Sequence, residues 1–171
     1  MNIETVTVYL GLGSNMGDRR ENLERALEYL SQRLGVIVKS SIYDTEPMEN
    51  PSQPRFLNMV CQAKTMLQPE DLLTLAKGIE RKMGRQPGRT NSPRPIDIDI
   101  LFYGDKVINT PGLVIPHPRM NYRAFVLVPL AEIATTLVHP VTKKTAKEML
   151  WDIKKGVQDV LKLEEQGAQD V

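Results

Sequence analysis

The feature that most constrains the fold is a strict alternation of apolar and acidic residues from Ile96 to Ile100, followed by Leu101. Side chains alternate between the two faces of a β-strand, so the isoleucines of this run face one side while Asp97 and Asp99 face the other. A strand of this kind buries one face and presents both carboxylates from the opposite face. The run therefore predicts a strand over residues 96–103 in a sheet that has a hydrophobic core on one side.

The periodicity of the other segments places further strands and helices around this strand. The expected elements are strands over residues 5–12, 36–43 and 56–67 and helices over residues 20–34 and 69–83. Their order, β-α-β-β-α-β, is that of a ferredoxin-like fold, an α+β class with helices packed on a largely antiparallel sheet. A terminal helix is expected from Ala146, with an apolar face that extends to Leu161. The apolar stretch over residues 125–134 is assigned no element.

Composition indicates one domain over residues 1–163, followed by a polar tail over residues 164–171. The net charge of +1 argues against an electrostatic nucleic-acid binder, which carries a marked basic excess. The sequence shows neither a secretory signal nor an apolar run of about 20 residues, so we expect a cytoplasmic protein with no membrane partner. We expect a monomer. The one cysteine, Cys61, is interpreted as a small core residue.

The two aspartates suggest a site for a divalent cation. Two residues along a strand span about 6.6 Å, close enough for both carboxylates to meet one cluster of cations. Magnesium suits such oxygen ligands and completes its coordination with water and phosphate oxygens. The basic residues just upstream, which suit phosphate, are Arg81, Lys82, Arg85, Arg89 and Arg94. The alternative is that these residues are solvated surface charges.

Two long Pro-rich segments, residues 44–55 and 85–95, exceed ordinary connection lengths and are expected to carry chemistry. His117 lies between two prolines that stiffen its backbone. A phosphate donor, an acid–base group and a packing residue all remain open interpretations for it. His139 is interpreted as structural. The glycines of the run Gly11–Ser14 are interpreted as allowing a tight exit from the first strand, because the run lacks the complete glycine pattern of a nucleotide-binding loop.

Five separated motifs occur in an order and spacing that resemble a known family. They are YLGLGSNMGD over residues 9–18, FLN over 56–58, IERKMGR over 79–85, PRPIDIDIL over 93–101 and PHPRMNYRAF over 116–125. Together they resemble the 6-hydroxymethyl-7,8-dihydropterin pyrophosphokinases of folate biosynthesis, over roughly residues 5–140. Each motif alone is weak, and the agreement of five is what makes the resemblance specific.

This resemblance implies transfer of a diphosphate group from ATP, the co-substrate, to the hydroxymethyl oxygen of the reduced pterin, with release of AMP. It implies two Mg²⁺ ions held by Asp97 and Asp99. The implied catalytic residues are Arg85, Arg94, Asp97 and Asp99. The implied ATP-binding residues are Glu80, Arg85, Arg94, Ile98, His117 and Arg123. The implied pterin-binding residues are Thr45, Met48, Phe56, Asn58, Asp97 and Phe125, with the two phenylalanine rings stacking on the pterin from opposite sides.

The sequence departs from the family pattern at Asn91–Ser92, where a Trp-Gly pair is usual, and around Met48, where a glycine usually follows soon after. No general base is evident, and Asp97, a metal-bound water and metal activation of the hydroxyl remain alternatives. Two other functions are considered. A nucleic-acid-binding module is disfavoured by three Phe, one Trp and the small net charge. A non-catalytic or substrate-altered paralogue is the second alternative.

Overall fold

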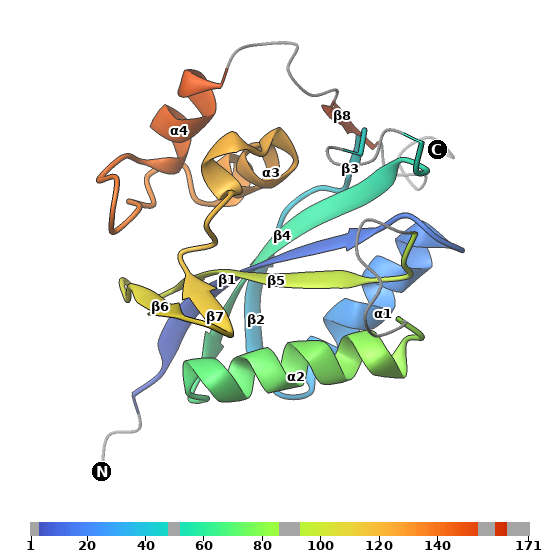
Figure 1. Ribbon diagram of the computed structural model, residues 1–171, viewed down its shortest axis with the longest axis horizontal. Coiled ribbons are helices and arrows are strands. Elements are labelled where there is room, and N and C mark those ends of the chain that lie inside the picture. The colour runs from blue at the N-terminus through green and yellow to red at the C-terminus, as the bar shows by residue number, and fades with distance from the viewer. Residues whose placement is uncertain (1–3, 48–51, 86–92, 154–159, 164–171) are drawn as a thin grey trace.

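The computed structural model describes residues 4–47, 52–85, 93–153 and 160–163. Its main sheet has six strands in the order β5-β1-β4-β3-β8, with β2 also paired to β4, and every pairing is antiparallel (Figure 1). The strands are β1 (Val6–Ser14), β2 (Gly35–Lys39), β3 (Tyr43–Thr45), β4 (Phe56–Thr65), β5 (Asp97–Tyr103), β6 (Ile108–Thr110), β7 (Leu113–Ile115) and β8 (Val160–Lys162). The helices are α1 (Arg19–Ser31), α2 (Pro69–Lys82), α3 (Ala124–Ile133) and α4 (Ala146–Asp152). The predicted α+β, ferredoxin-like order is confirmed.

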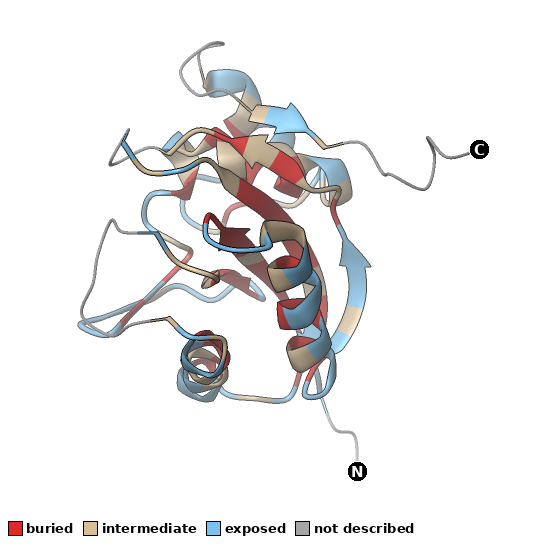
Figure 2. Cartoon of the chain, turned by 90° about the vertical axis from the view of Figure 1, so that its right-hand side faces the viewer, coloured by how far each residue is buried: buried red, intermediate tan, exposed pale blue. Residues whose placement is uncertain are grey.

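A hydrophobic core lies on each face of the sheet. Helices α1 and α2 cover one face, where the alternating residues Leu10, Leu12 and Ile98 are buried. Helices α3 and α4 cover part of the other face, where they pack against Leu101 and Phe102. Figure 2 shows the buried residues gathered along the sheet and on the inner sides of the helices. The uncovered part of the second face carries the polar side chains of β4 and β5.

Two sequence predictions need correction. The strand expected over residues 36–43 is two strands, because Ser40 interrupts the ladder: its hydroxyl accepts a hydrogen bond from the Val60 N–H at 2.9 Å. The terminal helix ends at Asp152, and Leu161 lies in β8, which pairs with β3. Apolar residues in a short segment fit a helical stripe or a strand equally well, so periodicity alone does not separate the two.

Other elements complete the second layer. Helix α3 forms from the apolar stretch to which the sequence assigns no element, and it includes Pro129. Its apolar residues lie all round the helix rather than on one stripe, so the usual amphipathic signal is weak.

His139 and Cys61 are buried, as expected for structural residues. The described part of the chain contains no helix long and apolar enough to cross a membrane. The predicted polar tail lies outside the described residues.

Candidate active site

The site is built on one row of residues that crosses three strands. In the β1–β4 ladder Gly13 pairs with Asn58, and in the β1–β5 ladder it pairs with Asp97. Neighbouring strands lie about 4.8 Å apart, so Asn58 and Asp97 are about 10 Å apart with glycine between them. A Cβ on Gly13 would lie 2.5 Å from Asn58 Oδ1 and 3.5 Å from the Phe56 ring. The missing side chain therefore leaves room for the Asn58 amide and forms an open floor.

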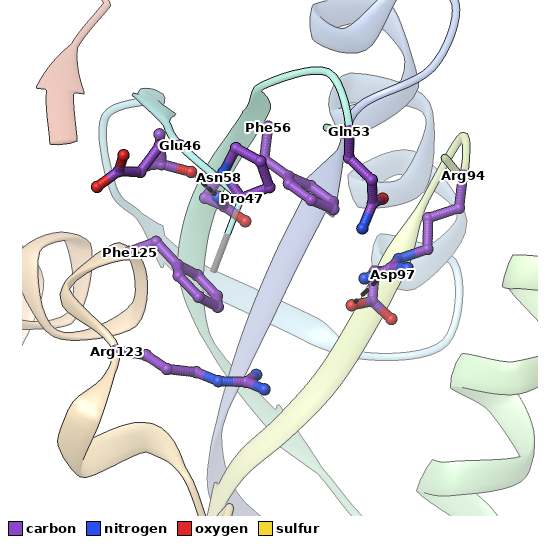
Figure 3. A pocket seen from close by; sticks show the side chains of 10 residues that line it. Glu46, Pro47, Gln53, Phe56, Asn58, Arg94, Asp97, Arg123 and Phe125 are labelled. Carbon is purple, nitrogen blue, oxygen red and sulfur yellow. Dashed lines mark hydrogen bonds and ion pairs between the residues drawn. The ribbon is translucent and has the colours of Figure 1, made fainter. Parts of the chain in front are cut away.

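Aromatic and amide groups line a pocket above this floor. Phe56 and Phe125 project into it from β4 and α3, as Figure 3 shows. Asn58 Nδ2 donates to Thr45 Oγ1 at 2.6 Å, and both residues are buried, so the amide is held in one orientation. The pocket residues are Thr45, Glu46, Pro47, Gln53, Phe56, Asn58, Arg94, Asp97, Arg123 and Phe125. Two rings with a fixed amide suit a flat ligand that has hydrogen-bonding groups at its edge.

Charged groups converge on Asp97 at one side of the pocket. Arg85 Nη1 lies 2.5 Å from Asp97 Oδ1, and Arg94 Nε lies 3.8 Å from Asp97 Oδ2. The Arg94 guanidinium also lies over the Phe56 ring, 5.2 Å from its centroid. Asp97 thus lines the aromatic pocket and also contacts two arginines. Guanidinium groups bind phosphate oxygens through paired N–H donors, so this side of the pocket suits a polyphosphate.

The buried carboxylate of Glu80 contacts both Arg85 and the main chain of β5. It is 2% exposed, and its Oε2 accepts a hydrogen bond from the Ile98 N–H at 2.8 Å. The same oxygen lies 3.4 Å from Arg85 Nη1, and Lys77 Nζ lies 3.4 Å from Oε1. Burial raises the pKa of Glu80, and the hydrogen bond from Ile98 opposes that rise. The carboxylate therefore fixes Arg85 and the strand segment between Asp97 and Asp99.

Asp99 lies between acidic and basic neighbours. Desolvation, and next the Asp97 carboxylate, raise the pKa of Asp99 to about 7, while Arg123 acts in the opposite direction. His117 Nε2 lies 4.0 Å from Asp99 Oδ1, and His117 Nδ1 accepts a hydrogen bond from the Arg119 N–H at 3.3 Å. A neutral imidazole with Nδ1 as acceptor carries its proton on Nε2. His117 therefore presents a donor to the site, which favours the phosphate-donor interpretation over packing.

The two carboxylates fit a magnesium ion. The described residues hold no group of three or more His, Cys, Asp or Glu side chains that could bind a metal. A cation here would complete its coordination with water and phosphate oxygens, as magnesium commonly does. The pKa of Asp99 is raised by desolvation and next by the Asp97 carboxylate, and a divalent cation beside both carboxylates would favour their charged forms. The donor chemistry and the electrostatics of the pair both suit the ion.

The structure brings most of the predicted residues together. The predicted residues that border the pocket or its charged side are Thr45, Phe56, Asn58, Glu80, Arg85, Arg94, Asp97, Asp99, His117, Arg123 and Phe125. The Ile98 side chain is 2% exposed in the core and its N–H bonds to Glu80, so an ATP contact through this side chain does not fit. Met48 and Arg89 lie outside the described residues.

Some cations suggested by the sequence lie elsewhere, and some site residues were missed. Lys82 Nζ lies over the Tyr29 ring, 4.7 Å from its centroid, away from the aspartates. Lys77, which contacts Glu80, was not predicted, although its position three residues before Glu80 on α2 was a usable signal. Gln53 and Pro47 line the pocket from the first Pro-rich segment, where no periodicity indicated which side chains turn inward.

The fold and the site together define a class: a ferredoxin-like enzyme with a pocket for a flat ring next to a cluster suited to a metal–polyphosphate. The family model for 7,8-dihydro-6-hydroxymethylpterin-pyrophosphokinase (HPPK) matches residues 9–135. The chain belongs to this family. ATP is the co-substrate of the family.

Individual relatives agree with the family match. The 2-amino-4-hydroxy-6-hydroxymethyldihydropteridine pyrophosphokinase of Aquifex aeolicus is 44% identical over 142 residues, covering 83% of this chain and 89% of that protein. The Bacillus subtilis protein of the same name is 42% identical, covering 88% of this chain and 93% of its own length. The chain is also 45% identical to the folic acid synthesis protein fol1 of Pneumocystis carinii, covering 82% of this chain but 19% of that longer protein.

Solved structures show the same fold. Plasmodium falciparum HPPK-DHPS matches with a TM-score of 0.68 over 87% of this chain and 45% of that chain. The sequence identity is 19%, so this likeness supports the fold alone.

Proposed function

We propose that the chain transfers the β,γ-diphosphate of ATP to the hydroxymethyl oxygen of 6-hydroxymethyl-7,8-dihydropterin, giving the pterin diphosphate and AMP. The observation that carries the proposal is the position of Asp97. Its carboxylate lines the aromatic pocket and also pairs with Arg85 at 2.5 Å, so the ring subsite and the phosphate subsite share one side chain. An alcohol on a ring in the pocket would therefore lie next to the groups that hold the polyphosphate.

The ring subsite orients the acceptor. We assign stacking on the pterin to Phe56 and Phe125 and hydrogen bonding at its edge to Asn58, with Thr45 fixing the amide. Because the Thr45–Asn58 pair is buried, its geometry is set before the substrate arrives. Holding the alcohol at a fixed approach to the phosphorus removes the entropy cost of bringing two substrates together.

The charged subsite holds the phosphates. We assign the polyphosphate to Arg85, Arg94 and Arg123 and a further hydrogen bond to His117. Magnesium at Asp97 and Asp99, for which we propose two ions, would neutralise phosphate charge and align the chain of phosphates. The acceptor oxygen forms a bond to the β-phosphorus while the bond from that phosphorus to the α-phosphate oxygen breaks. AMP leaves with that oxygen, and the alcohol proton is released.

This mechanism does not need a strong base. Transfers of this type depend mainly on positioning and on neutralising charge at the phosphates. The described site supplies both through its ordered amide, its arginines and the aspartate pair.

Product identification tests the proposal. Purified protein is incubated with ATP, Mg²⁺ and the reduced pterin alcohol, and the nucleotides are separated by ion-exchange chromatography. We expect AMP and pterin diphosphate in equal amounts, and no AMP without the pterin or after addition of EDTA. ADP with a pterin monophosphate would show a different transfer, and AMP without the pterin would show hydrolysis. Either result would contradict the proposal.

The alternative functions gain no support. Arg94, Asp97 and Arg123 line one pocket, and Arg85 pairs with Asp97 beside it. Relatives that match along nearly their whole length are named as the pyrophosphokinase. A non-catalytic or substrate-altered paralogue therefore has no observation in its favour.

A further inference from the structure

A buried asparagine at the end of β1 connects the two long segments that border the site. Asn15 follows the last residue of β1 and is 2% exposed. Its Oδ1 accepts a hydrogen bond from the Arg94 N–H at 2.8 Å, and its own N–H donates to the Arg94 carbonyl at 3.2 Å. Its Nδ2 donates to Gln53 Oε1 at 3.1 Å and to the Pro54 carbonyl at 3.2 Å. The side-chain amide thus engages both segments at once.

Both segments carry groups of the proposed site. Arg94 approaches Asp97 and lies over Phe56, so its main-chain position determines where its guanidinium can reach. Gln53 lines the pocket, and Pro54 is two residues before Phe56 in the chain. A shift of either segment would therefore move the phosphate-binding side chain of Arg94 relative to the ring-binding side chain of Phe56.

The pattern of bonds separates Asn15 from an ordinary turn residue. Asn22, in the first turns of α1, is a second asparagine with side-chain bonds to this region, and its Nδ2 donates to Ser14 Oγ at 3.3 Å and to the Met16 carbonyl at 2.9 Å. Ser14 is the last residue of β1 and Met16 lies in the turn that leads to α1, so both acceptors are within eight residues of Asn22. The side-chain bonds of Asn15 span 38, 39 and 79 residues of sequence. Asn22 therefore stabilises the turn, whereas Asn15 fixes two distant segments.

We infer that Asn15 is a positioning residue for the transfer: it aligns Arg94 with the segment that leads into Phe56, so that the phosphate and ring subsites meet. The inference rests on the proposed function. It also gives a role to Asn15 within the first motif, in which only the glycines are interpreted from the sequence. A buried amide is costly without partners, so its full set of bonds favours one arrangement of the two segments.

Asn15→Ala and Asn22→Ala form a matched pair for the test. Each loses two side-chain donations, and Asn15→Ala also loses the acceptor of the Arg94 N–H, so only this variant weakens the hold on both Gln53 and Arg94. A misplacement of about 1 Å near reacting groups costs up to about 100-fold in rate. We expect kcat of Asn15→Ala to fall about 10- to 100-fold, more than either KM rises, while Asn22→Ala stays within about twofold of wild type. Circular dichroism and thermal melting check that both variants fold.

A double variant adds a readout that a purely structural role would not move. If Asn15 acts through Arg94, adding Asn15→Ala to Arg94→Ala costs little beyond the single Arg94 change. Should Asn15→Ala fail to fold, the near-isosteric Asn15→Asp replaces it, since it too lacks both donations, and a loss of at least about tenfold is expected. Equal kcat values for the folded Asn15 and Asn22 variants would overturn the inference. Absence of AMP formation by the wild type would instead overturn the proposed function.

Discussion

The substitution Gly13→Ala isolates the contribution of the open floor between the ring subsite and the charged subsite. A Cβ at this position would lie 2.5 Å from Asn58 Oδ1, closer than real Cβ contacts come. The nearest ordinary contact is 3.4 Å, so the amide must move by about 0.9 Å. The backbone on β1 is held in two ladders, so the shift falls on the Asn58 side chain.

The structure sets the size of the effect. Moving the Asn58 amide stretches its 2.6 Å bond to Thr45 in a buried setting, where leaving a polar group unpaired costs about 1–3 kcal/mol. The gain in backbone rigidity from alanine offsets about 0.4–1 kcal/mol of that cost. A displaced edge group near the ring lowers kcat/KM for the pterin by about 10- to 100-fold. The KM for ATP is expected to stay nearly unchanged, because no arginine touches the new methyl group.

Gly11→Ala is the matched control, since Gly11 is two residues away on the same face of β1. The nearest atoms to a Cβ there are 3.6 Å away on Leu101, an ordinary contact. Steady-state kinetics with each substrate varied in turn would measure both variants, and we expect Gly11→Ala to stay within about twofold of wild type. Wild-type kcat/KM for the pterin in a folded Gly13→Ala protein would refute the steric reasoning.

Four further substitutions have defined outcomes. Asp97→Ala and Asp99→Ala should each fold but form no AMP, because both side chains lie off the core; wild-type-like turnover in either would remove the metal assignment. Glu80→Gln should lower the free energy of unfolding in urea by about 1.5–3 kcal/mol, since the buried negative charge that pairs with Arg85 and Lys77 is lost, and unchanged stability would count against its supporting role. The pKa of Glu132 is lowered, although desolvation opposes this, because hydrogen bonds from Tyr43 and Ser41 favour its charged form. The charged Glu132 therefore stabilises the folded state above about pH 4.5, and this stabilisation is lost as the pH falls through the lower folded-state pKa. The difference in melting temperature between wild type and Glu132→Gln should therefore shrink on acidification. A difference that is constant with pH would contradict this.

The elements with a clear period could be predicted from the sequence. The alternation around Asp97 and Asp99 defined β5 and the face on which the carboxylates lie. The apolar stripe after Pro69 defined α2. In both cases one side of the element faces a core and the other faces polar surroundings, so burial leaves a regular pattern in the sequence.

The elements without that asymmetry could not be predicted. Helix α3 is apolar all round, and β8 is three residues long, so neither carries a usable period. The role of Ser40 in dividing β2 from β3 depends on the hydrogen bond that its hydroxyl accepts from the Val60 N–H, which composition does not reveal. Such features come from tertiary contacts rather than from local preference.

The candidate site shows the same division. The motifs indicated which residues gather, because their types suit metal, phosphate and ring binding. They did not show that Gly13 pairs with both Asn58 and Asp97, since strand order and register are properties of the whole sheet. The links from Asn15 to Gln53 and Arg94 likewise join residues far apart in sequence.

A crystal structure with Mg²⁺ and α,β-methylene-ATP, in which the bond to be broken cannot react, tests the central claim most directly. We expect magnesium at about 2.1 Å from carboxylate oxygens of both Asp97 and Asp99, with the remaining positions filled by phosphate oxygens and water. Phosphates bound away from these carboxylates, with no metal density between them and the nucleotide, would contradict the account.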